Sequence, residues 1–175
     1  MKKFLLPLFL ASVVAASAQT LVTGADVGYL VDADETYTSA RLGWQFKANE
    51  TYAHELGLEV GYTRATEAGG KATLLPITAN YRLSSPISGR LGYYFGVGAG
   101  LARVRADGVS TTGPVTLRDT SFAAQGFTGL TLQASDTVAF TAGAKYIWID
   151  DVRLAGTSVE VGDDIAFSAG IQVKF

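Results

Sequence analysis

Residues Ile165–Phe175, IAFSAGIQVKF, alternate between two kinds of side chain with a period of two. The even positions are small or polar, and the odd positions are apolar: Ile165, Phe167, Ala169, Ile171, Val173 and Phe175. Strict alternation indicates a β-strand whose two faces meet different surroundings. The apolar face includes the last residue, Phe175, and a strand that faces water rarely ends on an exposed aromatic ring. We therefore expect this face to contact lipid and this strand to close a barrel.

Seven further segments alternate in the same way, at about 21–31, 37–47, 51–63, 72–83, 90–104, 120–133 and 137–149. Their lengths are near the roughly 9–11 residues with which a tilted strand crosses a bilayer. The sequence thus predicts an all-β fold, namely an eight-stranded antiparallel up-and-down transmembrane β-barrel.

The connections between these segments alternate in length. Three are tight, at 48–50, 84–89 and 134–136, and four are longer, at about 32–36, 64–71, 105–119 and 150–162. Short turns at one end and longer loops at the other are typical of outer-membrane barrels. An even number of strands then places both termini at the short-turn end, which is the periplasmic side.

The N-terminus has the pattern of a secretory signal peptide over residues 1–18. Lys2 and Lys3 are basic, Phe4 to Ala15 is mainly apolar, and residues 16–18, Ala-Ser-Ala, form a small-residue cleavage site. An uncleaved anchor helix is the alternative, but the apolar run is short for a membrane span. We expect an exported protein in which residues 19–175 form one barrel domain.

Composition excludes several classes of function. The chain has no Cys, so disulfides, thiolate metal sites and a cysteine nucleophile are excluded. The net charge of −2 gives no broad basic surface for nucleic acid.

The outward-facing aromatic residues are expected to form two girdles around an aliphatic band, as amphipathic rings do at membrane interfaces. The girdle near the longer loops contains Tyr29, Tyr62, Phe122, Tyr146, Trp148 and Phe167. The girdle near the short turns contains Trp44, Phe46, Tyr81, Tyr93, Phe95, Phe140 and Phe175. A soluble eight-stranded barrel of the lipocalin type has the opposite arrangement, with a polar exterior.

The inward-facing positions carry mixed acids, bases and amides: Asp26, Arg41, Gln45, Glu55, Glu59, Asn80, Arg82, Gln125, Lys145, Gln172 and Lys174. Eight strands leave an interior just wide enough for side chains, and buried charges must be paired. The favoured interpretation is a lumen plugged by a salt-bridged network, and the alternative is a narrow or gated path for ions or small solutes. The glycines at 92–100 either open room inside or accommodate large side chains such as Tyr94 and Arg82.

The chain resembles the eight-stranded outer-membrane barrels of the OmpA/OmpX type over nearly all of residues 19–175. The resemblance lies in the signal peptide, GYYFGVGAGLARV (92–104), AFTAGAKYIW (139–148) and AFSAGIQVKF (166–175). It implies residence in the outer membrane, with no periplasmic peptidoglycan-binding domain after the barrel. The ending resembles the signal that the barrel-assembly machinery reads, which would involve Phe167, Ile171, Val173 and Phe175.

Candidate catalytic, nucleotide or metal sites are weak. His54 should face outward near a short turn, and Ser39 is badly placed to act as its nucleophile. The glycines at 96–100 lack the spacing of a phosphate-binding loop. Clustered acids at the longer loops can bind Ca²⁺ or Mg²⁺, but more often are solvated charges: Asp32, Asp34, Glu35, Asp150, Asp151, Asp163 and Asp164.

The sequence therefore predicts a structural, envelope-integrity or surface-interaction role, with no enzymatic activity, cofactor or metal. Its expected partners are outer-membrane lipid, the assembly machinery and an unidentified ligand of the longer loops. A small porin-like channel is the second hypothesis, and a lipid-modifying outer-membrane enzyme is the third.

Overall fold

The computed structural model describes residues 20–47, 51–67, 70–110, 113–154, 157–159 and 162–175. The signal peptide expected at 1–18 and the tight turn expected at 48–50 lie outside the described residues. No helix among the described residues is long and apolar enough to cross a bilayer.

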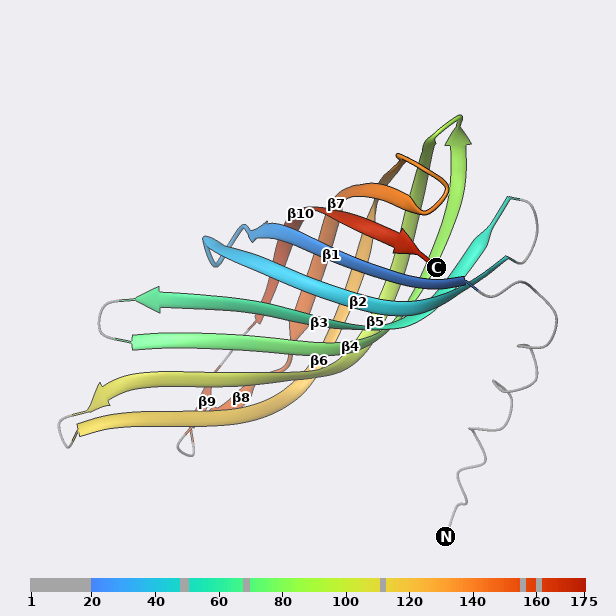
Figure 1. Ribbon diagram of the computed structural model, residues 1–175. Coiled ribbons are helices and arrows are strands. Elements are labelled where there is room, and N and C mark those ends of the chain that lie inside the picture. Colours follow the sequence, from blue (N-terminus) through green and yellow to red (C-terminus); the bar gives the residue numbers. More distant parts are fainter. Residues whose placement is uncertain (1–19, 48–50, 68–69, 111–112, 155–156, 160–161) are drawn as a thin grey trace, which may run out of the picture.

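Eight strands form a closed antiparallel barrel, which confirms the predicted fold class (Figure 1). Their bounds are β1 (Thr20–Leu30), β2 (Glu35–Lys47), β3 (Ala53–Glu67), β4 (Gly70–Ser88), β5 (Leu91–Ser110), β6 (Gly113–Gln133), β7 (Val138–Ile149) and β10 (Gly162–Lys174). Around the barrel they follow the order β1-β10-β7-β6-β5-β4-β3-β2, so each strand lies beside its neighbours along the chain. The last strand closes the barrel against the first, from Val22 opposite Lys174 to Leu30 opposite Ala166.

The chain enters β1 and leaves β10 at the same end of the barrel, here called the termini end. The backbone N–H of Phe175 donates to the carbonyl of Leu21 at 2.9 Å and fixes the last residue there. The opposite end, called the far end, carries the prolonged β3–β4 and β5–β6 hairpins (Figure 1).

These hairpins correct the expectation of two long loops at 64–71 and 105–119. Strand pairing continues to Glu67 opposite Gly70 and to Ser110 opposite Gly113. A continued ladder satisfies backbone N–H and C=O groups that a loop would leave to water. The polar side chains described there, such as Lys71, Arg105 and Arg118, are exposed, so they do not oppose this pairing.

The other connections also differ in detail from the expectation. The segment at 150–162 contains a short hairpin, β8 (Val152–Leu154) with β9 (Thr157–Val159). Strand β4 continues through the expected turn at 84–89 as far as Ser88, with a register shift between Pro86 and Ser88. Gly89 then turns the chain with a φ of 54°, in the left-handed region that favours glycine.

The connection between β1 and β2 is a tight turn rather than one of the longer loops. Its backbone N–H groups at Asp32 and Ala33 donate to the Asp164 carboxylate at 3.0 and 2.9 Å. The Tyr29 hydroxyl donates to the carboxylate of Asp34, which adopts a φ of 55°. Two of the acids considered above as metal ligands are therefore hydrogen-bond acceptors that shape this turn.

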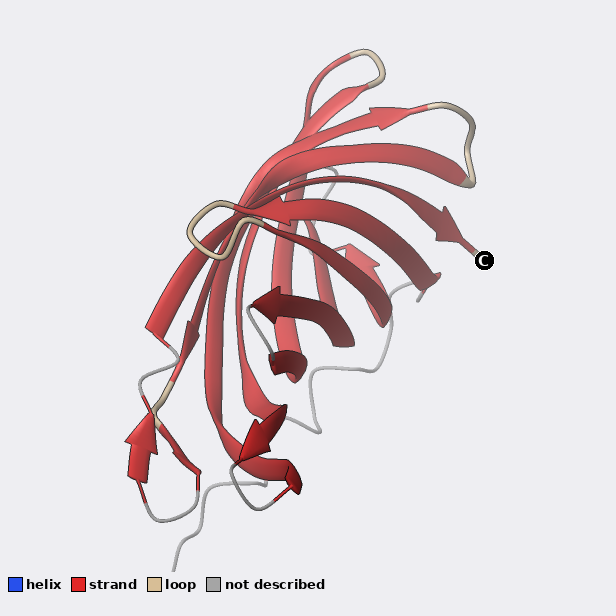
Figure 2. Ribbon diagram, turned by 90° about the vertical axis from the view of Figure 1, so that its left-hand side faces the viewer, coloured by secondary structure: helices blue, strands red, loops and turns tan. Residues whose placement is uncertain are grey.

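The exterior of the barrel is apolar. Val27, Leu58 and Val97 expose 57, 60 and 62% of their surface, although they lie in the middle of their strands. Apolar surface in water costs about 25 cal/mol per Å², and a surrounding bilayer removes this cost. Figure 2 shows the strands that form the barrel wall. The exposure of these apolar side chains places them on the outer face of that closed wall.

Candidate functional site in the barrel lumen

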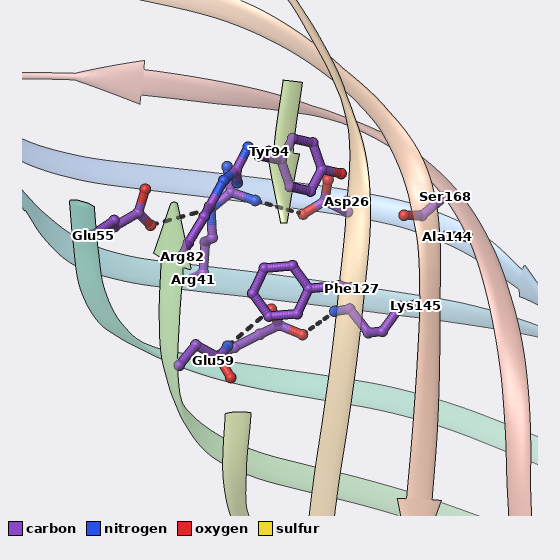
Figure 3. Close-up of a pocket in the computed structure, with 11 residues that line it drawn as sticks. Asp26, Arg41, Glu55, Glu59, Arg82, Tyr94, Phe127, Ala144, Lys145 and Ser168 are labelled. Carbon is purple, nitrogen blue, oxygen red and sulfur yellow. Dashed lines mark hydrogen bonds and ion pairs between the residues drawn. The ribbon is translucent and has the colours of Figure 1, made fainter. Parts of the chain in front are cut away.

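Arg41 is the centre of the polar contacts inside the barrel (Figure 3). Its Nη1 lies 3.3 Å from Asp26 Oδ2, its Nη2 donates to Gln172 Oε1 at 2.7 Å, and its Nε lies 3.7 Å from Glu55 Oε1. These partners come from β1, β10 and β3, while Arg41 itself comes from β2. One guanidinium thus ties together four strands, including the pair that closes the barrel.

A second set of polar contacts is centred on Glu59. Its carboxylate forms an ion pair with Lys145 and accepts a hydrogen bond from Asn80 Nδ2 at 3.3 Å. Asn80 Oδ1 in turn accepts from Gln125 Nε2 at 2.9 Å. The chain of contacts runs across β7, β3, β4 and β6. The Thr141 hydroxyl donates to Asp26 Oδ1 at 3.0 Å and so joins β7 to the Arg41 set.

Arg82 is the most deeply buried charge of the lumen, with 4% of its surface exposed. Its guanidinium lies 3.6 Å from the centre of the Tyr94 ring, a cation–π contact. Arg82 Nη2 and Glu55 Oε2 have no hydrogen-bond partner among the described residues, although the two residues are cross-strand neighbours. Counted together, Asp26, Glu55 and Glu59 balance Arg41, Arg82 and Lys145, so the network is neutral.

An apolar layer lies above this polar layer, toward the far end. Its side chains are buried and pack together: Leu30, Tyr37, Ala102, Ala123, Ile147, Ile149 and Ala166, with Leu74 against them. Lys145 Nζ lies 5.3 Å from the centre of the Tyr37 ring, where the two layers meet. The sequence interpretation missed this layer, although Ile147 and Ile149 share the inward parity of Lys145.

Phe127 is a second residue that sequence reasoning missed. It has the inward parity of Gln125, and its ring lies 6.3 Å from that of Tyr94 inside the lumen. Its position two residues after Gln125 is the signal that predicts an inward-facing ring.

Little space remains within the polar layer. A cavity of about 30 Å³ lies among Asp26, Arg41, Glu55, Arg82 and Lys145, which is close to the volume of one water molecule. A cavity of about 500 Å³ opens above the apolar layer, and one of about 270 Å³ opens at the termini end. Gln45 and Lys174, both predicted for the inner face, line this last cavity rather than the central network.

The residues expected in the aromatic girdles lie on the outer side of the barrel. Eleven of them expose between 38 and 73% of their surface: Tyr29, Trp44, Tyr62, Tyr81, Phe95, Phe122, Phe140, Tyr146, Trp148, Phe167 and Phe175. The other two, Phe46 and Tyr93, are half-exposed. Of the residues expected in the assembly signal, Phe167, Ile171 and Phe175 are exposed and Val173 is half-buried.

His54 faces outward among aromatic rings. Its Nδ1 lies 2.5 Å from the Tyr81 hydroxyl, and its ring stacks on Phe46 with centroids 5.5 Å apart. Ser39 faces the lumen and is buried, so the two side chains lie on opposite sides of the wall. A nucleophile and its base need hydrogen-bond contact, which this arrangement does not provide. Among the described residues, no group of three or more His, Cys, Asp or Glu side chains is placed to hold a metal ion.

The fold is similar to those of several solved outer-membrane barrels. Neisserial surface protein A is 19% identical with a TM-score of 0.62, covering 90% of this chain and 97% of that one. Ail, the attachment invasion locus protein of Yersinia pestis, is 14% identical with a TM-score of 0.54, covering 90% and 97%. The outer-membrane enzyme PagL is 13% identical with a TM-score of 0.51, covering 87% and 98%. At these identities the similarity concerns the fold alone.

Comparison by sequence gives no assignment. No family model matches the chain, and no curated protein matches it.

Proposed function

We propose that this protein is a bacterial outer-membrane barrel with a structural, envelope-integrity or surface-interaction role, and that its lumen is not a path for solutes. The observation that carries the proposal is the two-layer filling of the lumen. A neutral polar network spans the wall from β1 to β10, and an apolar layer lies above it.

Each layer opposes ion passage for a different reason. The apolar layer offers an ion no hydrogen-bond partners to replace its water, as in the hydrophobic constrictions that close channels. In the polar layer, an ion would have to displace partners from charges that are costly to leave unpaired. Because Arg41 contacts three other strands, opening the polar layer would also disturb the wall itself.

Location and partners follow from the same proposal. Residues 1–18 act as a signal peptide, the apolar exterior contacts outer-membrane lipid, and both termini face the periplasm. The alternating residues that end in Phe175 are read by the barrel-assembly machinery. The acidic turn between β1 and β2 and the prolonged hairpins then face the outside, where they meet surface ligands.

We further propose that the protein is not an enzyme, since His54 and Ser39 lie on opposite sides of the wall.

Planar-bilayer recording of the purified, refolded protein tests the proposal. We expect no discrete conductance steps from the native protein. The Ile147→Ala and Ile149→Ala double variant, which thins the apolar layer, is the informative comparison, and Leu130→Ala on the outer face is its matched control. Discrete steps from the native protein whose size changes in Glu59→Gln would refute the proposal.

A small channel is the second candidate. It is favoured by the cavities of about 500 and 270 Å³ that open at the two ends of the lumen. A gating motion would have to move the polar and apolar layers that lie between these two cavities, and the same recording decides between the two functions.

A further inference from the structure

A group of basic side chains covers one part of the outer surface at the far end. Arg64 on β3, Lys71 on β4, Arg103 and Arg105 on β5, and Arg118 on β6 are all exposed. They are called the basic collar below. Each lies on the same outer strand face as the apolar residues closer to the middle of the barrel. Arg64, for example, lies two residues beyond Tyr62, and Arg103 lies two residues beyond Leu101.

The strand register concentrates this charge. Arg105 is directly opposite Arg118, and the same row across the sheet continues through Thr73 to Arg64. Like charges directly opposite on neighbouring strands are destabilising. One acid reduces the repulsion, because Arg105 Nε lies 2.9 Å from Asp107 Oδ2. Five bases against this single acid leave an excess of four positive charges among the described outward-facing side chains of this region.

The opposite side of the same end is acidic. The described residues of the β1–β2 turn and of the β7 and β10 ends carry Asp32, Asp34, Glu35, Asp150, Asp151, Asp163 and Asp164. The chain as a whole has a net charge of only −2. The basic collar is therefore not a general property of the surface but a separation of charge across one end of the barrel.

The height of the basic collar matches that of lipid head groups. A strand rises about 3.3 Å per residue, so Arg64 lies about 7 Å along β3 beyond Tyr62, and Arg103 lies as far beyond Leu101. Tyr62 and Leu101 are exposed on the apolar face. Long basic side chains at such a boundary keep their charge at the interface while their stems cover apolar surface.

We propose that the basic collar binds the phosphate groups of anionic lipids in the leaflet at the far end, so that the β3–β6 side of the barrel is surrounded by anionic lipid. The inference rests on the proposed insertion into a membrane. Arginine suits this ligand because its planar guanidinium can hold two phosphate oxygens at once. The ligand is the head group of a lipid already beside the wall, because the collar continues directly from the lipid-facing surface.

Lipid selectivity of the folded protein in mixed bilayers tests the proposal. The full barrel is reconstituted in phosphatidylcholine vesicles that contain spin-labelled phosphatidylglycerol or spin-labelled phosphatidylcholine, and the motionally restricted fraction of each label is measured. One basic residue near an anionic surface strengthens binding about fivefold. The measurement averages over lipid sites all round the barrel, of which the basic collar contacts only a part. We therefore expect about twofold selectivity for phosphatidylglycerol, and we expect screening to reduce it at about 0.5 M salt.

Variants identify the source of the selectivity. The triple variant R64Q/R105Q/R118Q keeps Lys71 and Arg103 of the basic collar, so it should lose most of the selectivity. Arg90→Gln, which removes an exposed arginine from the termini end, should keep the native ratio. Arg118→Gln alone removes one member of the like-charge pair, so it should lower the ratio even if the triple variant does not fold. Equal ratios for Arg118→Gln and the native protein would overturn the proposal.

Two further measurements separate the alternatives. Heat-modifiable gel migration reports whether the barrel has folded into the vesicles. If the native protein folds into the vesicles but shows no lipid selectivity, only the proposal for the basic collar is refuted. If the native protein does not insert, the proposed function is refuted too. Inorganic phosphate at about 10 mM should leave the selectivity unchanged if the site is a lipid site, since this concentration screens little. Loss of selectivity in phosphate, or binding of a soluble sulfated polysaccharide without lipid selectivity, would also overturn the proposal.

Discussion

Val97→Arg places a charge in the middle of the surface that we assign to lipid. Val97 exposes 62% of its surface and lies between Tyr81 on β4 and Gly126 on β6. Along β5 it is flanked on the outer face by Phe95 and Ala99, between the two predicted girdles. An arginine at the bilayer midplane of a barrel costs about 2–4 kcal/mol, which is about a 30-fold to 900-fold change in the unfolding equilibrium.

Equilibrium urea unfolding in phospholipid vesicles measures this change. Thr36→Arg is the matched control, because Thr36 faces outward on β2 opposite Tyr29, at the level of the predicted outer girdle. An arginine near the interface costs only about 0–1 kcal/mol. A depth-dependent difference between the two variants supports a lipid-facing exterior. Equal losses of stability for Val97→Arg and Thr36→Arg in vesicles would contradict the assignment. So would a native protein that folds and stays soluble in buffer without detergent and loses the same stability in both variants.

Two other predictions concern the lumen and the far end. Removing either partner of the buried Lys145–Glu59 pair leaves the other charge uncompensated. Lys145→Met and Glu59→Gln should therefore each lower the free energy of unfolding by about 3–5 kcal/mol, and the double variant should lower it by less than their sum. Additive losses in urea unfolding would mean that the pair is not coupled. Hydrogen bonds from the Thr116 hydroxyl and Arg105 lower the pKa of Asp107, which lies on the β5 extension beyond the membrane band. Its contribution to stability is then present above the ordinary pKa of an aspartate and is lost as the pH falls through the lowered folded-state pKa. Hydrogen exchange should show the β5–β6 extension opening more readily at acid pH, and Asp107→Asn should remove this pH dependence while leaving the β1–β2 turn unchanged.

The number of strands and the face of each side chain could be predicted because a period of two is a local property. Lys145 and Tyr146 must point to opposite faces whatever the rest of the chain does. The height of a side chain in the barrel is not local, since it depends on the register of every strand pair. For this reason the contacts of Arg41 with Asp26 and Gln172 could not be read from the sequence, although all three were expected inside.

The ends of the strands were less predictable because polarity and pairing are separate properties. Residues near 105–119 are rich in charged and small polar side chains, which is typical of loops. In the barrel they pair backbone to backbone as far as Ser110 opposite Gly113. Among the side chains that the structure describes there, Arg105, Thr116 and Arg118 are exposed. Polarity therefore predicted a loop here, but the backbone of this segment remains in its two strands.

The glycines of the inner face show how the lumen can be full even though many of its wall positions lack a side chain. A Cβ atom at Gly129 would lie 2.6 Å from the Tyr94 hydroxyl, and one at Gly143 would lie 2.5 Å from it. The tyrosine ring can therefore lie over β6 and reach β7 only because these two neighbouring strands present bare backbone to it. Arg82 then rests on the face of that ring. The roles considered above for the glycines at 92–100 were to open room inside or to accommodate large side chains. Gly129 and Gly143, on the next two strands, have the second role, because they make space for Tyr94.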